Sequence, residues 1–547
     1  MRSCAQSSTP SIATFPSFAA EVGSFRSNAL HGYGAAAATP HVLATQAAMA
    51  LIATGGNAVD AAIAANAVLG VVAPETCGIG GDLFALVHRP GMQKPDVLNS
   101  SGRAGAGADA AKLRGQGHRS MPPFDPQTVT VPGCVDGWEA LMARYGSKDL
   151  HAVLAPAIAL ATDGFPASIE LVGALTRRPE LAAQTAARAL YPEANPPAVG
   201  ERLRRPDLAL TLQAIAAAGR DGFFLGEAGA GIVQATGGVI TPADLREVQA
   251  EWTEPLGTEA FGLTGWVVPP NSQGYLTIGS AAVMDRLEPP DDPEDPLSWH
   301  LAIEAYRSMA ADRNDLVSDP KHVPQPPAAL VSADRIAERA RRVDPGRAGD
   351  FTSPSPVPGG TAYLAVIDAA GLAVSFIQSN FMGVGSGLGA GAAGFFLHNR
   401  GAGFDLRPGH PNELAPGKRP LHTLSPSLWT KGDRIACLLG TRGGDYQPQL
   451  LLQVAVRHLR AGIEASEAQA RPRWMIEPID GANPIVAVEA HTPPRTIEYL
   501  QRLGHRIAVQ SDVQHGWGPV SLITVDEHGK RTAAADPRVD TATAAVN

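Results

Sequence analysis

Residues 359–368 read Gly-Gly-Thr-Ala-Tyr-Leu-Ala-Val-Ile-Asp, and this stretch decides how the rest of the chain is interpreted. A flexible Gly-Gly step is followed by the hydroxyl residue Thr361 and then by an apolar run that predicts a β-strand. Residues 352–358, Thr-Ser-Pro-Ser-Pro-Val-Pro, precede it as a linker that does not fit inside a helix or a sheet. Thr361 is therefore either a turn residue at a strand start or a nucleophile that cleavage makes N-terminal.

The second interpretation has a chemical basis in the residues themselves. A threonine hydroxyl is a weak nucleophile that needs a base, and an N-terminal threonine carries one in its own α-amino group, with an ordinary pKa of about 7.7–8.0. The hydroxyl of Thr361 could attack the carbonyl of Gly360, and the resulting ester would hydrolyse to free the amine. Gly360 has no side chain to obstruct this step. The serine motif GxSxG is absent from the sequence.

Composition narrows the class of protein. The chain has 547 residues, 44% hydrophobic and 18% charged, so it is long enough for two domains or one large two-part domain. The net charge is −9, and no basic stripe is present, which argues against a nucleic-acid partner. There is no run of 18 apolar residues and no secretory h-region near the N-terminus, so we expect no membrane partner and a cytoplasmic location.

Metal and nucleotide sites are poorly supported. The four cysteines (Cys4, Cys77, Cys134 and Cys437) are far apart, so isolated buried thiols are expected in place of a metal cluster or a disulfide framework. The fifteen histidines form no HExxH pattern. The glycine turn at residues 77–82 lacks the spacing of a dinucleotide or Walker loop. We therefore expect no cofactor and no metal.

Hydrophobic patterning predicts a mixed α and β chain. Residues 1–37 are expected to be a disordered tail, with Thr39 and Asn57 as N-caps of two alanine-rich helices. The strand after Thr361 and the segment 372–378 predict a β-hairpin, turned at residues 369–371. Further strands are expected at 435–439, 485–489, 507–510 and 520–525, and a helix at 448–459.

Many segments in order resemble the γ-glutamyltranspeptidase family. The first half contributes residues 38–61, 78–82, 131–138 and 270–274, and the second half contributes 361–368, 377–381, 385–387, 396–400, 416–426, 440–445 and 470–474. The resemblance implies the fold of the N-terminal-nucleophile hydrolases, an α+β four-layer αββα sandwich. It also implies a precursor that cuts itself into a large subunit, residues 38–360 after the tail, and a small catalytic subunit, residues 361–547. The subunits would stay together as a heterodimer, and two such heterodimers could pair.

The resemblance also assigns the catalytic residues. Thr361 matches the nucleophile, and the cleaved bond joins Gly360 to Thr361. Ser379 matches a second hydroxyl residue that assists the nucleophile and the self-cleavage. The family's nearby asparagine is matched by Asn380 one place early. Gly443 and Gly444 match the backbone donors of the oxyanion hole, where preorganised N–H groups stabilise the tetrahedral intermediate.

The residues at the positions that bind a γ-glutamyl group in the family depart from the family pattern. Gly403 replaces the aspartate that holds the substrate's α-amino group, and His422 and Thr423 replace two serines that hold its α-carboxylate. The family's arginine aligns with Ser101, and Arg103 lies two residues on, from where a guanidinium could bind a carboxylate. We therefore expect the catalytic core to be intact and glutathione to be a poor substrate.

Three functions follow from this. The favoured one is a self-processing threonine hydrolase or acyltransferase that cleaves γ-glutamyl or related small-molecule amides through an acyl-enzyme, with water or an amine as acceptor. The second is an acylase on glutaryl side chains, as in cephalosporin-acylase-like relatives. The third, from another class, is a non-catalytic binding protein on the same fold. An intact Thr361 with Gly443 and Gly444 argues against the third.

Overall fold

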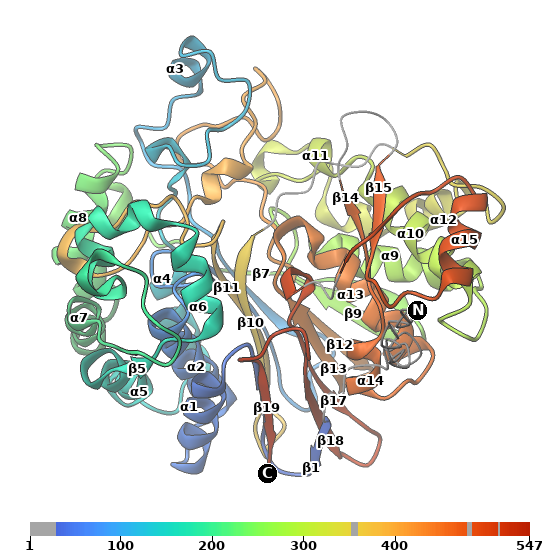
Figure 1. The fold of residues 1–547 in the computed structure, drawn as a ribbon, viewed down its shortest axis with the longest axis horizontal. Helices are drawn as coiled ribbons and strands as arrows, with labels where there is room; N and C mark the ends of the chain where they lie inside the picture. Colours follow the sequence, from blue (N-terminus) through green and yellow to red (C-terminus); the bar gives the residue numbers. More distant parts are fainter. Residues whose placement is uncertain (1–28, 352–358, 478–483, 512–514) are drawn as a thin grey trace, which may run out of the picture.

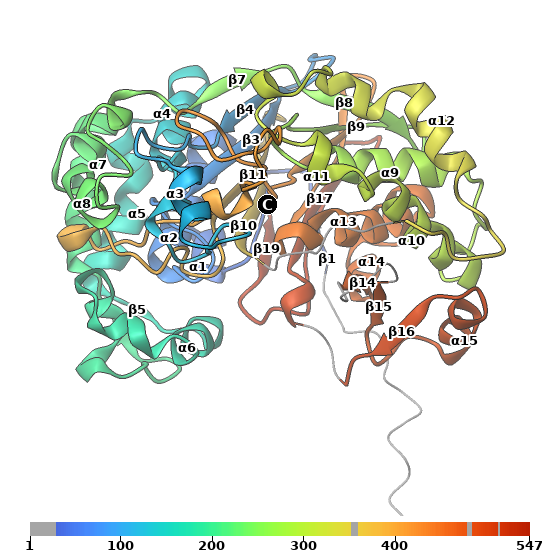
Figure 2. The same cartoon turned by 90° about the horizontal axis from the view of Figure 1, so that it is seen from above.

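The computed structural model describes residues 29–351, 359–477, 484–511 and 515–547. Two seven-stranded sheets face each other at the centre of the molecule, and helices cover the outer face of each (Figures 1 and 2). This arrangement confirms the predicted four-layer αββα sandwich. Among the described residues, every helix is too short or too polar to cross a membrane.

The sheet that carries Thr361 contains strands from the whole length of the chain. All of its pairings are antiparallel, and its order is β19 (Thr543–Val546), β2 (Ala36–Thr39), β10 (Gly360–Ile367), β11 (Ala373–Phe381), β3 (Asp82–His88), β4 (Asp96–Ser100) and β7 (Glu251–Thr253). The predicted hairpin is β10 and β11, which pair Ile367 with Ala373 at the turn.

The facing sheet is also antiparallel and also mixes distant segments. Its order is β1 (Ala29–Gly32), β18 (Arg531–Ala535), β17 (Val520–Val525), β13 (Arg434–Thr441), β12 (Ser427–Lys431), β9 (Leu263–Val267) and β8 (Leu256–Ala260). A small third sheet, β14 (Trp474–Glu477), β15 (Ile485–Val488) and β16 (Arg506–Val509), lies beside it. The predicted strands at 435–439, 485–489, 507–510 and 520–525 fall on β13, β15, β16 and β17.

Helices form the two outer layers. The sheet containing β10 is covered by α1 (Val42–Ala53), α2 (Ala58–Val72), α4 (Cys134–Tyr145), α5 (Leu150–Asp163), α7 (Pro206–Phe224) and α8 (Glu227–Ala235). The other sheet is covered by α9 (Tyr275–Arg286), α10 (Pro296–Ala310), α12 (Ala333–Arg341), α13 (Gln447–Ala455), α14 (Ala465–Ala470) and α15 (Pro494–Arg502). Smaller elements are α3 (Ala110–Gly115), α6 (Ile169–Thr176), α11 (Arg313–Leu316), β5 (Phe165–Pro166) and β6 (Arg202–Leu203).

Strand alternation explains why β10 lies at the centre. Tyr363, Ala365 and Ile367 belong to the core between the two sheets, and Leu364 and Val366 belong to the core beneath the helices. Successive side chains of a strand point to opposite faces, so a strand buried on both faces must be apolar throughout. The apolar run after Thr361 meets this requirement.

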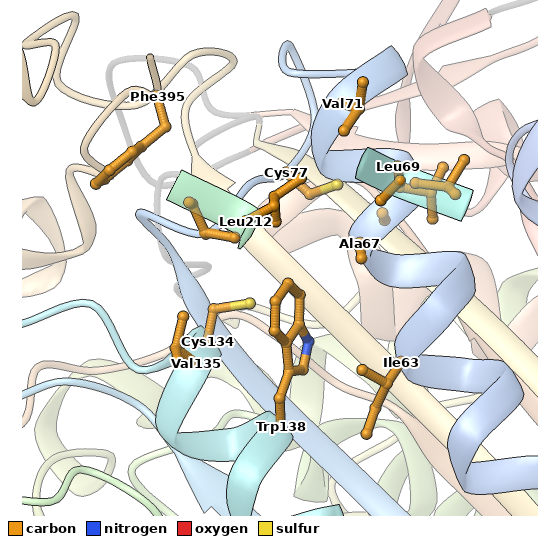
Figure 3. Close-up of a cluster of buried hydrophobic side chains, with 14 of the residues drawn as sticks. Ile63, Ala67, Leu69, Val71, Cys77, Cys134, Val135, Trp138, Leu212 and Phe395 are labelled. Atoms are coloured by element: carbon orange, nitrogen blue, oxygen red, sulfur yellow. The ribbon is translucent and has the colours of Figure 1, made fainter. Parts of the chain in front are cut away.

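The helical layer beside β10 is closely packed around α2. Asn57 caps this helix as predicted. The Asp60 carboxylate accepts a hydrogen bond from the Asn57 backbone N–H, which completes a capping box. Figure 3 shows Trp138 of α4 packed beside α2, and its indole N–H donates to Asn66 at 2.8 Å. Small alanine side chains on α2 allow this close approach.

Three of the predicted buried thiols are confirmed. Cys77, Cys134 and Cys437 are free and buried, and the first two lie in the core drawn in Figure 3. Cys4 lies outside the described residues.

The predicted end of the N-terminal tail, at residue 37, is wrong. Residues 29–32 and 36–39 form β1 and β2, so the ordered chain includes part of the stretch that was assigned to the tail. Pairing with β18 and β19 near the other chain end orders these residues, and such long-range pairing leaves no local signal. Residues 1–28 lie outside the described residues. The N-cap of α1 is His41, since Thr39 is the last residue of β2.

Candidate active site

Thr361 lies at an irregularity in the central sheet. Gly360 pairs with Phe381 and Ala362 pairs with Gln378, so two residues of β11 lie opposite the single residue Thr361. Such a β-bulge bends the strand and re-aims a side chain. Here it brings Ser379 of β11 to the start of β10.

The two hydroxyl groups converge on one carbonyl. Thr361 Oγ1 lies 2.7 Å from the Gly360 oxygen and 3.3 Å from Ser379 Oγ. Ser379 Oγ donates to the same Gly360 oxygen at 2.6 Å and accepts from the Phe381 N–H at 2.7 Å. Both side chains are buried. The hydroxyl of Thr361 therefore lies against the peptide bond whose cleavage would make it N-terminal.

Gly360 is closely surrounded, so we expect Gly360→Ala to slow self-cleavage by roughly 10-fold or more. A methyl group at this position would meet the Glu75 carbonyl oxygen at 2.7 Å and Gly383 N at 3.1 Å. The Gly360 carbonyl group would therefore shift away from the Thr361 hydroxyl. The half-time of processing on a denaturing gel measures the effect. Gly115→Ala is the control, because a methyl group there has no neighbour within 4 Å. Equal half-times for the two variants would contradict the expectation.

Gly443 and Gly444 form the turn after β13 and lie beside the same peptide segment. Their φ values are 127° and 58°, in the region that favours glycine. A methyl group on Gly359 would meet Gly444 Cα at 3.1 Å, which shows how closely the turn approaches the bond. Gln273 Nε2 donates to the Gly444 oxygen at 3.2 Å and to the Thr423 oxygen at 3.1 Å, so one side chain holds two loops together.

Arg400 supplies positive charge next to these hydroxyls. Its Nη2 lies 3.3 Å from Ser379 Oγ, its Nη1 donates to Thr423 Oγ1 at 2.9 Å, and its guanidinium stacks 4.1 Å from the Phe381 ring centroid. Burial lowers the pKa of Arg400 to about 10, and the charge of Asp82 opposes this, so the group stays protonated at neutral pH.

A buried carboxylate flanked by two histidines lies beneath the site. His422 Nε2 contacts Asp82 Oδ2 at 3.0 Å, and His398 Nδ1 lies 3.6 Å from the same oxygen. The Leu424 N–H donates to His422 Nδ1 at 3.3 Å, which places the ring proton on Nε2, facing Asp82. Burial raises the pKa of Asp82, but the neighbouring His398 and His422 outweigh it and hold the pKa at about 2. Asp82 is therefore ionised.

Two buried histidines make the fold sensitive to acid. Burial, followed by the charge of Arg400, lowers the pKa of His422 to about 3, and burial beside His300 lowers the pKa of His505 to about 3. In the unfolded chain each takes up a proton near pH 6.5. Stability therefore falls as the pH drops from about 6.5 toward about 3, by roughly 1.4 kcal/mol per pH unit for each histidine.

We expect a lower urea midpoint at pH 5 than at pH 7.5, and a smaller difference for His505→Asn. His505 Nε2 contacts His300 Nδ1 at 2.8 Å, away from the catalytic residues. A midpoint that is the same at both pH values would contradict this assignment.

A cavity of about 170 Å³ opens beside the site. Its lining residues come from the end of β11, the loops before β12, the start of α11 and the turn after β13; they are Arg313, Asn314, Phe381, Ala402, Gly403, Phe404, Asp405, Asn412, Leu421, Thr423 and Asp445. Arg313 pairs with Asp445 across this cavity and donates to Gln273 Oε1 at 2.7 Å. The cavity is therefore polar and adjoins the Gly443–Gly444 turn.

The structure brings together only some of the predicted substrate-binding residues. Thr423 lines the cavity. His422 is fully buried against Asp82, and Asn380 packs against the glycine turn at Gly81. Arg103 donates to Gln249 and pairs with Glu251 at 3.5 Å, and it does not line the cavity.

Sequence reasoning missed Arg400, Phe381 and Asp82 as site residues. Arg400 and Phe381 lie inside segments that resemble the family, but nothing local distinguishes an arginine that reaches a serine 21 positions earlier. Asp82 contacts a histidine 340 positions away. The available signal was Asp82 at the end of the glycine-rich turn at residues 77–82, and a cluster of polar residues after the apolar pair Phe396-Leu397.

Comparison with known proteins fits this geometry. The model of the family described as gamma-glutamyltranspeptidase matches residues 44–546. The chain belongs to the γ-glutamyltranspeptidase family. It is 34% identical to the glutathione hydrolase-like YwrD proenzyme of Bacillus subtilis, over 92% of this chain and 96% of the relative. It is also 34% identical to the oxamate amidohydrolase proenzyme of Klebsiella pneumoniae, over 93% and 98%.

A solved structure agrees across nearly the whole length. The cephalosporin acylase of Bacillus halodurans superimposes with a TM-score of 0.88 at 32% identity, over 98% of this chain and 99% of the acylase. Members of the γ-glutamyltranspeptidase family are autoprocessed proenzymes whose two subunits form a heterodimer. The chain is accordingly a hydrolase or acyltransferase of this family, acting on γ-glutamyl or related amide bonds of small molecules.

Proposed function

We propose that Thr361 is the nucleophile and that the chain matures by cleavage of the Gly360–Thr361 bond. The observation that carries this is the convergence of Thr361 Oγ1 and Ser379 Oγ on the Gly360 carbonyl oxygen, at 2.7 and 2.6 Å. In the precursor, Thr361 Oγ1 attacks this carbonyl carbon, and the peptide C–N bond breaks to give an ester and a free α-amino group. Water then hydrolyses the ester, which restores the hydroxyl and leaves a carboxylate on Gly360. Ser379 stabilises the developing negative charge by hydrogen bonding.

The same groups then act on the substrate. The freed α-amino group of Thr361 accepts the hydroxyl proton as Oγ bonds to the amide carbonyl carbon. The N–H groups of Gly443 and Gly444 stabilise the oxyanion, with each donor contributing about 2.7–4 kcal/mol. The C–N bond breaks, the amine leaves with the proton, and water or an amine acceptor releases the acyl group.

The identity of the acyl group distinguishes two candidate functions. The γ-glutamyl clamp is incomplete, because Gly403 offers no carboxylate, and a methyl group there would already meet the Leu421 oxygen at 2.5 Å. Similarity to a cephalosporin acylase favours acylase activity on other side chains as the second candidate. Rates of hydrolysis of γ-glutamyl and glutaryl p-nitroanilides by the processed enzyme separate the two. Hydrolysis of neither would overturn both acyl assignments.

We expect the proposed subunits to remain associated after cleavage. The sheet of β10 would take β2, β3, β4 and β7 from residues 1–360 and its other strands from 361–547. The facing sheet would likewise combine β1, β8 and β9 with four strands of the second part. Separation would expose both cores, so the two fragments should co-elute in size-exclusion chromatography and separate only in denaturant. Two separate peaks in native buffer would contradict this.

A further inference from the structure

Arg400 is a buried cation with no acidic partner. Its side chain is fully buried, and in the ranges that the structure describes no carboxylate oxygen lies within ion-pair distance of it. Its two Nη atoms contact only the neutral hydroxyls of Ser379 and Thr423. Its Nε has no hydrogen-bond partner among the described residues.

The other buried arginines that the structure describes each pair with a carboxylate or donate to a backbone carbonyl. Arg538 forms ion pairs with Glu489 and Asp536, and Arg313 pairs with Asp445. Arg205 lacks an acid but donates to three backbone carbonyls, those of Gly70, Val71 and Gly394. A buried guanidinium without such partners is unfavourable, because it has lost its hydration and gained little in return. Arg400 therefore has the capacity to bind an added anion.

The nearest carboxylate is already engaged elsewhere. Asp82 faces His422 at 3.0 Å and accepts from the Gly102 N–H at 2.9 Å. It lowers the local potential around Arg400 without contacting it. Arg313, which lines the adjoining cavity, is paired with Asp445, so Arg400 is the unpaired cation among the charged groups described at this site.

Arg400 lies close to the reacting carbonyl. Ser379 Oγ is 3.3 Å from Arg400 Nη2 and 2.6 Å from the Gly360 oxygen, so a single hydroxyl separates the guanidinium from the bond that is cut. Phe381 and Thr423, which both contact Arg400, also line the adjoining cavity.

We propose that Arg400 binds the carboxylate of the acyl donor, and that the preferred substrates are monoamides of short dicarboxylic acids. The carboxylate would be bonded directly to the scissile carbonyl carbon or separated from it by one or two methylene groups. A guanidinium suits this task because its planar N–H groups match the two oxygens of a carboxylate. No α-ammonium group is required, in agreement with the missing side chain at Gly403.

This inference rests on the proposed function for its chemistry. Thr361 Oγ bonds to the amide carbonyl carbon, the C–N bond breaks, and the leaving nitrogen takes the proton that the α-amino group had accepted. Water then attacks the ester, which releases the dicarboxylate and restores the hydroxyl. Arg400 stays bound to the distal carboxylate throughout and fixes the carbonyl against Thr361.

The test uses the processed enzyme and measures ammonia release from oxamate, malonamate and succinamate, each against its methyl ester. We expect kcat/KM for at least one acid to exceed that of its ester by about 100-fold. Arg400→Gln should lower kcat/KM about 100-fold on the acid and less than about 3-fold on the ester. Arg400→Lys should fall between them. Arg342→Gln, at an exposed pair with Glu338, is the control and should change neither rate.

Each other outcome is also decisive. An equal loss on acid and ester in Arg400→Gln would overturn the proposal and leave Arg400 as a positioning residue for Ser379. If that variant does not fold or process, the wild-type comparison decides, and no preference for acid over ester overturns the proposal. Calorimetric titration with malonate separates this inference from the catalytic one. Malonate binding by a processed but inactive enzyme would support carboxylate binding by Arg400 and contradict the assignment of Thr361 as the nucleophile. Hydrolysis of neutral amides without malonate binding would support Thr361 as the nucleophile and contradict carboxylate binding by Arg400.

Discussion

Thr361→Ala is expected to leave the 56.8-kDa chain uncut and to lower amide hydrolysis by roughly 10⁴-fold or more. The variant removes the hydroxyl that lies 2.7 Å from the Gly360 oxygen, so neither self-cleavage nor acyl-enzyme formation has a nucleophile. A denaturing gel after long incubation measures the first effect, and the rate on the best amide substrate measures the second.

Thr361→Ser is the matched control for this variant. It keeps a hydroxyl in the same place and loses only a methyl group, so it should still be cut and should still turn over, though more slowly. A Thr361→Ala protein that is cut at the same position as the wild type would exclude Thr361 as the self-cleaving residue. Loss of cleavage in both variants would point to misfolding, which circular dichroism would reveal.

Arg538→Met is expected to lower the free energy of unfolding by about 3–5 kcal/mol. Arg538 donates to both oxygens of Glu489, at 2.8 and 2.6 Å, and to Asp536 at 3.3 Å, and all three side chains are fully buried. Removing Arg538 takes the guanidinium partner from Glu489 and leaves Arg473 as the ion-pair partner of Asp536. The cost of this buried charge exceeds the gain from a better-packed apolar side chain. Urea denaturation of the uncut Thr361→Ala chain measures it without the complication of two subunits.

Arg342→Met provides the comparison for Arg538→Met. Arg342 pairs with Glu338 at 3.6 Å on an exposed helix face, where an ion pair contributes about 0–1 kcal/mol. The two variants make the same chemical change at a buried and an exposed site. Similar losses at both would show that the buried network contributes no more than a surface pair.

The central hairpin and much of the sheet could be predicted because their signals are local. The apolar run after Thr361 and the return strand through Gln378 are separated only by the short turn at residues 369–371, so the pairing of β10 with β11 is close in sequence. The capping of α2 by Asn57 was equally visible, since the capping box lies within four residues. Residues 29–32 and 36–39 could not be predicted as strands because their partners, β18 and β19, lie about 500 positions away.

The candidate site also contains residues that the sequence predicts and residues that it does not. Thr361, Ser379, Gly443 and Gly444 were found through resemblance, and the structure places the two hydroxyls 3.3 Å apart. Arg400 lies in the segment 396–400 that resembles the family, but the resemblance gives it no role. Its lack of an acidic partner is a property of three-dimensional burial, and no spacing in the sequence encodes it.

Intact mass analysis and N-terminal sequencing of the purified protein test the central claim most directly. We expect two chains, and the smaller one begins at Thr361. A single chain that stays uncut on long incubation, or a fragment that begins at any other residue, would contradict it.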